Sequence, residues 1–146
     1  MEFTRKYWLE KVCLNVGVKY HPCGRNEFGL DCIGAGVVKP LNDCGVDTSH
    51  VDLKAYSPEG DGINLSYIFN NMFNQKSIDE IKEGDIILMK FFKHPQHIGV
   101  FLGNYYNNGK NYMLHASTLY DKVAIHDFND WINRVVCVYS LKEFID

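Results

Sequence analysis

The sequence has few prolines, no long apolar run and no cluster of basic residues. Only four prolines occur in 146 residues. The longest apolar stretches, such as Ile86–Met89, are far shorter than the about 20 residues that span a bilayer. Lys and Arg total 15 against 18 Asp and Glu, a net charge of −3, so nucleic-acid binding is not indicated. Residues 1–11 lack the apolar core of a secretory signal, and we expect neither a signal peptide nor a membrane anchor.

The cysteines also lack any familiar pattern. Five are present, an odd number, and no two of them are separated by only two residues. A disulfide framework and a structural zinc site are therefore not indicated. We expect reduced thiols, most of them buried as small apolar side chains, and no cofactor. The five are Cys13, Cys23, Cys32, Cys44 and Cys137.

The remaining composition is that of an ordinary globular domain. Hydrophobic residues make up 46% and charged residues 23%, and no repeat or linker divides the chain. We therefore expect one domain over residues 1–146. A first helix is predicted within residues 4–17, with Thr4 as its N-cap and Gly17 as its stop. Its predicted apolar side consists of Tyr7, Trp8, Val12 and Leu14.

A second helix is predicted to begin at about Cys32, within the stretch CIGAGVVK. Gly34 and Gly36 lower its helix propensity, and Pro40 is expected to end or kink it. The helix should therefore be short, or packed so closely against a neighbour that small residues are required.

Further along, helical periodicity gives way to strand patterns. A third helix is predicted over residues 64–75, capped by Asp61 or Asn64, with an apolar stripe of Leu65, Ile68, Phe69, Met72 and Phe73. Five strand-like segments then follow, at residues 84–92, 97–103, 111–117, 122–128 and 134–141. This order predicts an α+β fold, with N-terminal helices packed on a central antiparallel sheet of about five to six strands.

Cys32 lies where a nucleophile would be placed, at the predicted start of the second helix. A cysteine nucleophile needs a base that forms the thiolate and a third group that orients the base. The N–H groups and partial positive charge of a helix N-terminus lower a thiol's pKa and can bind an oxyanion. A buried structural cysteine is the alternative, and it is the commoner interpretation of a cysteine considered alone.

His97 and His115 are the candidate partners. Strand alternation puts His97, Gly99 and Phe101 on one face, opposite an apolar stripe. Residues 104–111 predict a hairpin turn to the strand of His115. If the numbers of opposed residues add to an even total, the two histidines share a face and His115 can orient His97. Sequence alone does not fix that register, and a surface position is the alternative for either histidine.

The other histidines carry weaker signals. His94 and His97 form an HxxH pair, but Pro95 lies between them in a predicted loop entering a strand. A helical metal site is therefore not expected there. His126 alternates onto one face of its strand, and we expect it to be exposed.

Four motifs in order resemble a known family. GLDCIG, EGDIILMKF, HIGVFLGN and LHAS are similar to motifs of the NlpC-type cell-wall cysteine peptidases, compact papain-like enzymes that cut peptidoglycan stem peptides. The resemblance runs from about Trp8 to about Tyr139. The stretches YHPCGRNEFGLDCIG, GDGINL and HPQHIGVF resemble the phage-tail branch of the family more closely. In this resemblance Cys32 matches the nucleophile, His97 the general base and His115 the residue that orients it.

Two further positions match residues that line the substrate site. Tyr20 matches a tyrosine near the oxyanion, and Asp31 matches an acid that in some members binds a free substrate amine. Those members usually carry serine directly after the cysteine, whereas this chain has Ile33. The difference favours an uncut stem peptide as substrate.

The resemblance implies a cysteine endopeptidase of the peptidoglycan hydrolase type, in a phage tail tip or hub that helps to penetrate the bacterial wall. The protein would be made in the host cytoplasm and reside in the virion. Its partners would be stem peptides and tail proteins, without a nucleic acid or membrane anchor. One alternative is a structural tail or adaptor protein on the same fold with little activity. Others are an amidase or acyltransferase on a papain-like core, or a zinc hydrolase.

Overall fold

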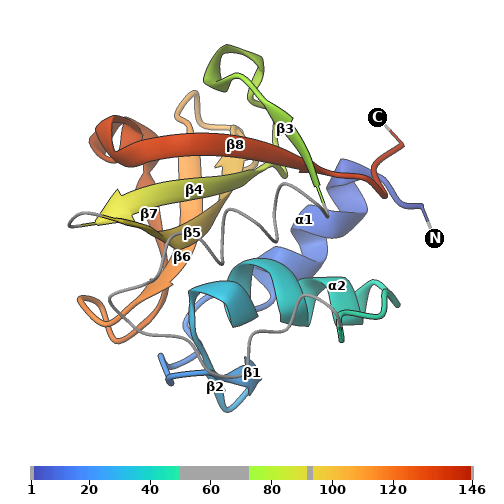
Figure 1. The fold of residues 1–146 in the computed structure, drawn as a ribbon, viewed down its shortest axis with the longest axis vertical. Helices are drawn as coiled ribbons and strands as arrows, with labels where there is room; N and C mark the ends of the chain where they lie inside the picture. Colours follow the sequence, from blue (N-terminus) through green and yellow to red (C-terminus); the bar gives the residue numbers. More distant parts are fainter. Residues whose placement is uncertain (1, 50–72, 92–93, 146) are drawn as a thin grey trace.

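The computed structural model describes residues 2–49, 73–91 and 94–145. In these ranges, helical segments from the first third of the chain lie beside a six-stranded antiparallel sheet (Figure 1). The strand order is β3-β8-β4-β5-β6-β7. These strands are β3 (Phe73–Lys76), β4 (Ile86–Phe91), β5 (His94–Gly103), β6 (Tyr112–Ser117), β7 (Lys122–Asp127) and β8 (Val135–Leu141). The arrangement confirms the predicted α+β fold.

The helical segments and a small hairpin complete the described fold. Before the sheet come α1 (Arg5–Cys13), β1 (Arg25–Asn26), β2 (Gly29–Leu30), η1 (Gly34–Val38) and α2 (Lys39–Asp43). Short 3-10 turns are η2 (Ile78–Glu80), η3 (Phe128–Asp130) and η4 (Ile132–Arg134). Strands β1 and β2 pair with each other as a separate two-stranded sheet, and Lys19 before them bridges to Lys122 of β7.

Helix α1 begins as predicted after Thr4, whose Oγ1 accepts a hydrogen bond from Tyr7 N at 3.1 Å. It ends at Cys13 rather than at Gly17. The predicted apolar side is partly wrong, because Tyr7 and Leu14 are exposed. The buried stripe is Trp8, Leu9 and Val12. Each such side chain, fully buried, stabilises the fold by about 1.5–3 kcal/mol.

The second helix runs without a break from Cys32 through η1 and α2. Pro40 was expected to end or kink this helix, and it does not end it. Pro40 has no N–H to donate, and its ring would crowd the carbonyl four residues back in a regular helix. Here the N–H of Lys39, the residue before Pro40, donates to the carbonyl of Gly34. The acceptor lies five residues back, so the turn is a π-helix. The wider turn accommodates the proline.

Two glycines of this helix lie at close packing contacts. A Cβ on Gly34 would lie 2.1 Å from the carbonyl oxygen of Gly24. A Cβ on Gly36 would lie 3.2 Å from Cδ1 of Ile98 in β5. The helix therefore touches the loop before β1 at a position where no Cβ fits, and touches the sheet at a position where a Cβ would press on the flexible end of Ile98. The sequence-based alternative of close packing is confirmed.

Both faces of the sheet are buried. Ile98, Val100 and Leu114 belong to the core that includes the helices. The other face carries a second core of Ile87, Met89, Phe101, Met113, Phe128 and Trp131. Strand alternation along β5 is therefore as predicted, with Phe101 opposite the stripe of Ile98 and Val100.

Two segments differ from the predicted elements. The predicted third helix lies mostly outside the described residues, but its end is wrong, because Phe73–Lys76 forms strand β3. Pairing with β8 supplies the backbone hydrogen bonds there and overrides the helical spacing of the apolar residues. Strand β5 begins at His94 rather than at His97, and pairs with the end of β4 where a loop was predicted.

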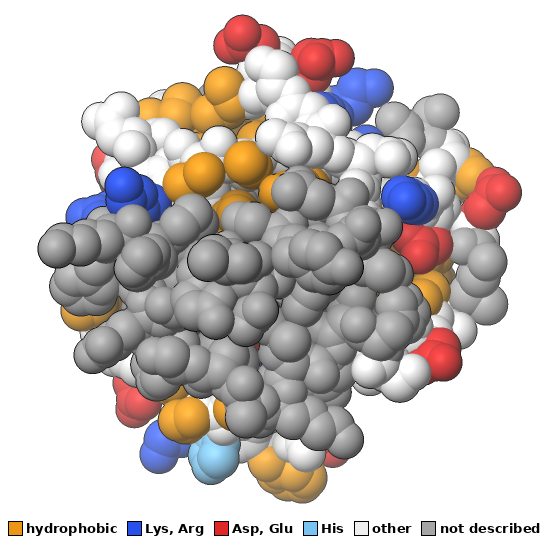
Figure 2. All heavy atoms as spheres, viewed as in Figure 1, with side chains coloured by type: hydrophobic (Ala, Val, Ile, Leu, Met, Phe, Trp, Pro, Cys, Tyr) orange, Lys and Arg blue, Asp and Glu red, His pale blue; other side chains and the backbone are white. Residues whose placement is uncertain are grey.

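Charges of both signs are interspersed around the face of the molecule seen in Figure 2. Hydrophobic side chains also reach the surface there, over the region of β8 and β4. Val136 of β8 is one of the exposed apolar residues. Scattered apolar residues of this kind are normal on a protein surface.

The close approach of Gly34 to a backbone carbonyl generates a prediction for stability. We expect Gly34→Ala to lower the free energy of unfolding by about 1–3 kcal/mol, because the carbonyl of Gly24 cannot move without shifting its loop. Gly36→Ala is the matched control in the same π turn, where the new methyl meets only the flexible end of Ile98. Urea unfolding followed by circular dichroism gives both values. Equal stability of the two variants would contradict this account of the packing.

Candidate active site

Asp31 and Cys32 form the start of the second helix. Asp31 Oδ1 accepts a hydrogen bond from Gly34 N at 2.7 Å, and Asp31 O accepts the first helical bond from Ala35 N at 2.9 Å. Asp31 is thus the N-cap and Cys32 the first helical residue. Cys32 is 7% exposed. Its position places the thiol in the partial positive charge of the helix N-terminus.

The Asp31 carboxylate is fully buried and already paired. Arg25 Nη1 donates to the same Oδ1 at 2.8 Å and also to Gly24 O at 2.8 Å. The ion pair joins the β1–β2 hairpin to the helix start. Removing one partner of a buried pair typically costs about 3–5 kcal/mol, because the other charge is left uncompensated. Asp31 therefore has a clear structural function in this fold.

The register of β5 and β6 answers the question that the sequence left open. Val100 lies opposite Leu114, so the numbers of opposed residues add to an even total and both histidines share a face. His97 Nε2 and His115 Nδ1 are 2.8 Å apart, a hydrogen-bond distance, with the two rings at 84°. His97 is 9% exposed and His115 is 1% exposed. The structure thus brings these two predicted residues together in a buried pair.

Burial controls the protonation of this pair. Desolvation lowers the pKa of His97 from 6.5 to about 4. Desolvation, followed by the charges of His97 and His126, lowers the pKa of His115 to about 3. Both rings are therefore uncharged at neutral pH. An uncharged His97 is in the form that accepts a proton.

Tyr20 lies close enough to Cys32 for the charge of the thiolate to affect the pKa of its phenol. Burial, followed by the charges of Cys32 and Asp31, raises the pKa of Tyr20 to about 12, so the phenol keeps its proton. The backbone N of Tyr20 donates to Asp121 O at 2.9 Å, and Tyr20 bridges to Leu30. These contacts tie its loop to β2 and to the turn after β6. Tyr20 can therefore donate a hydrogen bond near the helix start.

The helix begun by Cys32 packs on β5 and β6, the strands that carry the two histidines. Gly36 approaches Ile98, the neighbour of His97 in the chain. Cys32 belongs to the same core as Ile98 and Ala116, which flank His97 and His115 in the chain. The helix thus packs on the face of Ile98 and Val100, while the two histidines belong to the face of Phe101 and Met113 on the same two strands.

Three residues beside the histidine pair were missed or misjudged. His126, expected to be exposed, is half-buried, with its ring centroid 5.0 Å from that of His115. Trp131 and Tyr120 complete the cluster, at 4.8 Å and 5.9 Å from the His115 ring. His126 lies opposite Met113, on the His115 face. Two sequence features could have indicated this position of His126. They are the short turn between β6 and β7 and the alternation in residues 122–128.

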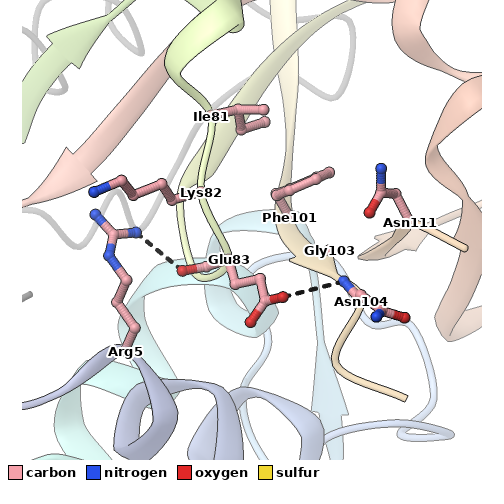
Figure 3. Close-up of a pocket in the computed structure, with 8 residues that line it drawn as sticks. All are labelled: Arg5, Ile81, Lys82, Glu83, Phe101, Gly103, Asn104 and Asn111. Carbon is pink, nitrogen blue, oxygen red and sulfur yellow. Dashed lines mark hydrogen bonds between the residues drawn. The ribbon is translucent and has the colours of Figure 1, made fainter. Parts of the chain in front are cut away.

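A cavity of about 490 Å³ lies elsewhere, near the other end of β5 (Figure 3). Arg5 Nη1 donates to Glu83 O at 2.9 Å there, and Asn104 N donates to Glu83 Oε1 at 3.3 Å. Gly103 in its wall is roughly 20 Å along the extended strand from His97. The cavity is therefore separate from the candidate active site.

The described residues contain no group of three or more His, Cys, Asp or Glu side chains arranged to hold a metal ion. All five cysteines are free thiols; Cys44 and Cys32 are buried and Cys23 is exposed. In the same part of the chain, no helix is long and apolar enough to cross a membrane.

A helix-start cysteine on an antiparallel sheet is the arrangement of the papain-like α+β class, and comparison with known proteins specifies the family. The NlpC/P60 family model matches residues 17–140, so the chain belongs to the NlpC/P60 family. No curated protein sequence matches the chain.

Solved structures share this fold at low sequence identity. The NlpC/p60 domain of the peptidoglycan hydrolase SagA has a TM-score of 0.67 at 15% identity, over 95% of this chain and 100% of that domain. An NlpC/P60 family protein from Bacillus cereus gives 0.69 at 15% identity, over 97% of this chain but 41% of that one. RipD from Mycobacterium tuberculosis, described as a non-catalytic peptidoglycan-binding protein, gives 0.62 at 14% identity, over 96% and 98%. The family thus includes hydrolases and a non-catalytic member.

The depressed histidine pKa values predict a loss of stability in acid. Below pH 6.5 the unfolded chain binds more protons than the folded one, so stability is full above 6.5 and falls as the pH drops towards 4 and 3. The loss at pH 5 is about 2 kcal/mol for each histidine.

We expect His115→Gln to remove about half of the loss that the pair contributes, since one titrating group is gone. Urea unfolding at pH 7.5 and at pH 5 measures it. His21→Gln, in an exposed loop, is the matched control for replacing a histidine outside the buried pair. An unaltered pH dependence in His115→Gln would show that this imidazole is not buried uncharged.

Proposed function

We propose that this protein is a cysteine endopeptidase that hydrolyses the stem peptides of bacterial peptidoglycan. The observation that carries the proposal is the buried contact of 2.8 Å between His97 Nε2 and His115 Nδ1. This contact occurs in an NlpC/P60 chain whose second helix begins at a cysteine and packs on the strands of both histidines. A buried imidazole pair is costly unless it serves a purpose, and positioned imidazoles are the commonest general bases.

In the proposed reaction, His97 removes the proton of the Cys32 thiol. Because Nε2 of His97 is engaged with His115, we assign Nδ1 as the basic nitrogen. The thiolate attacks the carbonyl carbon of a stem-peptide bond, and the tetrahedral oxyanion accepts hydrogen bonds from the Cys32 backbone N–H and the Tyr20 hydroxyl. The imidazolium gives its proton to the leaving amine. Water, deprotonated by His97, then hydrolyses the thioester and restores the thiol.

His115 is proposed to orient His97 and to stabilise its imidazolium form. For that purpose Nδ1 of His115 must accept the Nε2–H of His97, so the proton of neutral His115 must lie on its own Nε2. The ring is enclosed by Trp131 and His126, which restricts its rotation.

Asp31 is proposed to hold the helix start rather than to bind a substrate amine. Its Oδ1 accepts hydrogen bonds from Arg25 and Gly34, and its side chain has no exposed surface. Ile33, which follows the cysteine, is also buried. These contacts support an uncut stem peptide, without a free amine near Cys32, as the substrate.

The second candidate function is that of a peptidoglycan-binding or adaptor protein without catalysis. The observation in its favour is the similar fold of RipD, which is described as non-catalytic and adapted to peptidoglycan binding. Fold similarity at this identity does not distinguish the two functions. Reactivity of Cys32 does.

We further propose that the protein acts in a phage tail tip or hub, next to other tail proteins, and enters the virion after synthesis in the host cytoplasm. The support is the similarity of residues 20–34 and 94–101 to the phage-tail branch of the family. Mass spectrometry of purified virions from a phage that encodes the chain tests this. Particles that infect normally but lack the chain would refute the tail assignment.

Removal of the thiol should abolish hydrolysis. We expect wild type to release new fragments from purified peptidoglycan and Cys32→Ala to be at least about 10³-fold slower, since the nucleophile is gone. Mass spectrometry of the digest identifies the fragments and the bond. Cys23→Ser, at an exposed position, is the control and should keep full activity. Equal fragment release by Cys32→Ala, or none by folded wild type on walls of several cross-link types, would overturn the proposal.

The proposed pairing of Cys32 with His97 has its own measurement. In a Cys23→Ser background, we expect iodoacetamide to alkylate Cys32 rapidly at pH 6.5, and His97→Ala to slow this about tenfold or more because the base that takes the thiol proton is gone. Peptide mapping at timed points gives the rate at each cysteine. Cys44, buried and with a pKa raised to about 11 mainly by desolvation, is an internal control that should stay unlabelled. An equal rate in His97→Ala would refute the pairing.

A further inference from the structure

A third histidine extends the pair across the sheet. His126 of β7 lies on the same face as His115 of β6, with ring centroids 5.0 Å apart and ring planes at 70°. Tyr120 lies 4.4 Å from the His126 ring, and Trp131 lies 5.7 Å from it. His97, His115 and His126 thus occupy three adjacent strands, β5, β6 and β7, in one row.

The row contains two buried nitrogen atoms that lack a partner. Nε2 of His115 and Nε2 of His126 are both inaccessible to solvent, and neither has a hydrogen-bond partner among the described residues. A buried nitrogen without a hydrogen-bond partner is unfavourable, because it has lost its bonds to water. Two such atoms on neighbouring rings, one required as a donor and the other able to accept, are chemically complementary.

The tautomer of His115 determines which of its two ring nitrogens is the donor. If Nδ1 of His115 accepts from His97, the single proton of neutral His115 is on Nε2. In the other tautomer, Nδ1–H of His115 donates to His97 Nε2, and His97 cannot then become an imidazolium without placing two protons between the rings. The tautomer of His115 therefore decides whether His97 can carry a second proton.

We propose that His126 is a positioning residue, whose ring accepts the Nε2–H of His115 and thereby selects the tautomer that lets His97 act as a base. This inference rests on the proposed function of Cys32 and His97, which it deepens. The acceptor is Nε2 of His126, reached directly by a small ring rotation or through one bridging water. His126 touches no substrate in this account and acts only through His115.

The groups around His126 are consistent with an uncharged acceptor. Desolvation lowers the pKa of His126, and the nearby carboxylate of Asp130 in η3 opposes that shift. His115 faces it from β6, Tyr120 from the turn between β6 and β7, and Trp131 from the segment between η3 and η4. Arg134 of η4 lies against the Trp131 ring, 5.9 Å from its centroid.

The test compares His126→Phe with His126→Gln, in a Cys23→Ser background. Phe keeps an aromatic ring but cannot accept a hydrogen bond, whereas the Gln carbonyl can. The rate of Cys32 alkylation by iodoacetamide is followed from pH 5 to pH 9. We expect the midpoint of the profile in His126→Phe to move up by about one pH unit, with about tenfold slower alkylation at pH 6.5. His126→Gln should stay close to wild type.

A second measurement determines the tautomer itself, and its result in wild type alone can test the inference. Nitrogen-15 NMR of the histidine rings at pH 7 should show His115 protonated at Nε2 in wild type, and a shift towards Nδ1–H in His126→Phe. Protonation of His115 at Nδ1 in wild type would overturn the inference, even if His126→Phe failed to fold. So would an unchanged alkylation profile in a folded His126→Phe.

The two proposals fail in different ways. If wild-type Cys32 shows no alkylation that depends on His97, the proposed catalytic function is wrong and the role of His126 falls with it. If the dependence on His97 is present but His126→Phe behaves as wild type, only the role of His126 is wrong.

Discussion

The arrangement of the candidate site depends on how closely the second helix approaches its neighbours. Gly34 lies against the backbone carbonyl of Gly24, and Gly36 lies against Ile98. Only a residue without a Cβ fits at the first position, and the backbone on both sides is thereby fixed. The Asp31 cap and its bond to Arg25 hold the same end of the helix. Cys32 is thus positioned by the packing and capping of the residues around it.

This constraint explains which parts of the fold could be predicted from sequence. The strands after Gly84 were recognisable because each carries a short, distinct pattern and the two sheet faces alternate clearly. The helix beginning at Cys32 was recognisable, but its π turn was not. The π turn occurs beside Pro40 and within the closely packed stretch of Gly34 and Gly36, and a propensity scale contains neither feature. Strand β3 was missed for a similar reason, because only pairing with β8 makes it a strand.

In the candidate site, too, some features were predictable from the sequence and others depended on tertiary structure. The helix-start thiol and the two histidines were identifiable as residue types in order, whereas their contact required the register of β5 against β6. His126 was underestimated because a histidine on an alternating strand is usually exposed. Its burial comes from Trp131 and Tyr120, which lie in turns at other points of the chain. Sequence patterns within one element cannot show which turn covers which face.

A row of uncharged imidazoles is a poor stabiliser of a fold. Desolvation penalises protonation of His97 and His115, and two ring nitrogens stay unpaired among the described residues. Apolar side chains such as Met113 and Phe101 occupy the rest of this face and could have filled it more cheaply. The NlpC/P60 fold is compatible with both catalytic and non-catalytic proteins. Function in this chain is therefore better tested through the protonation of His97, His115 and His126 than inferred from the fold, because the fold is shared by proteins of both kinds.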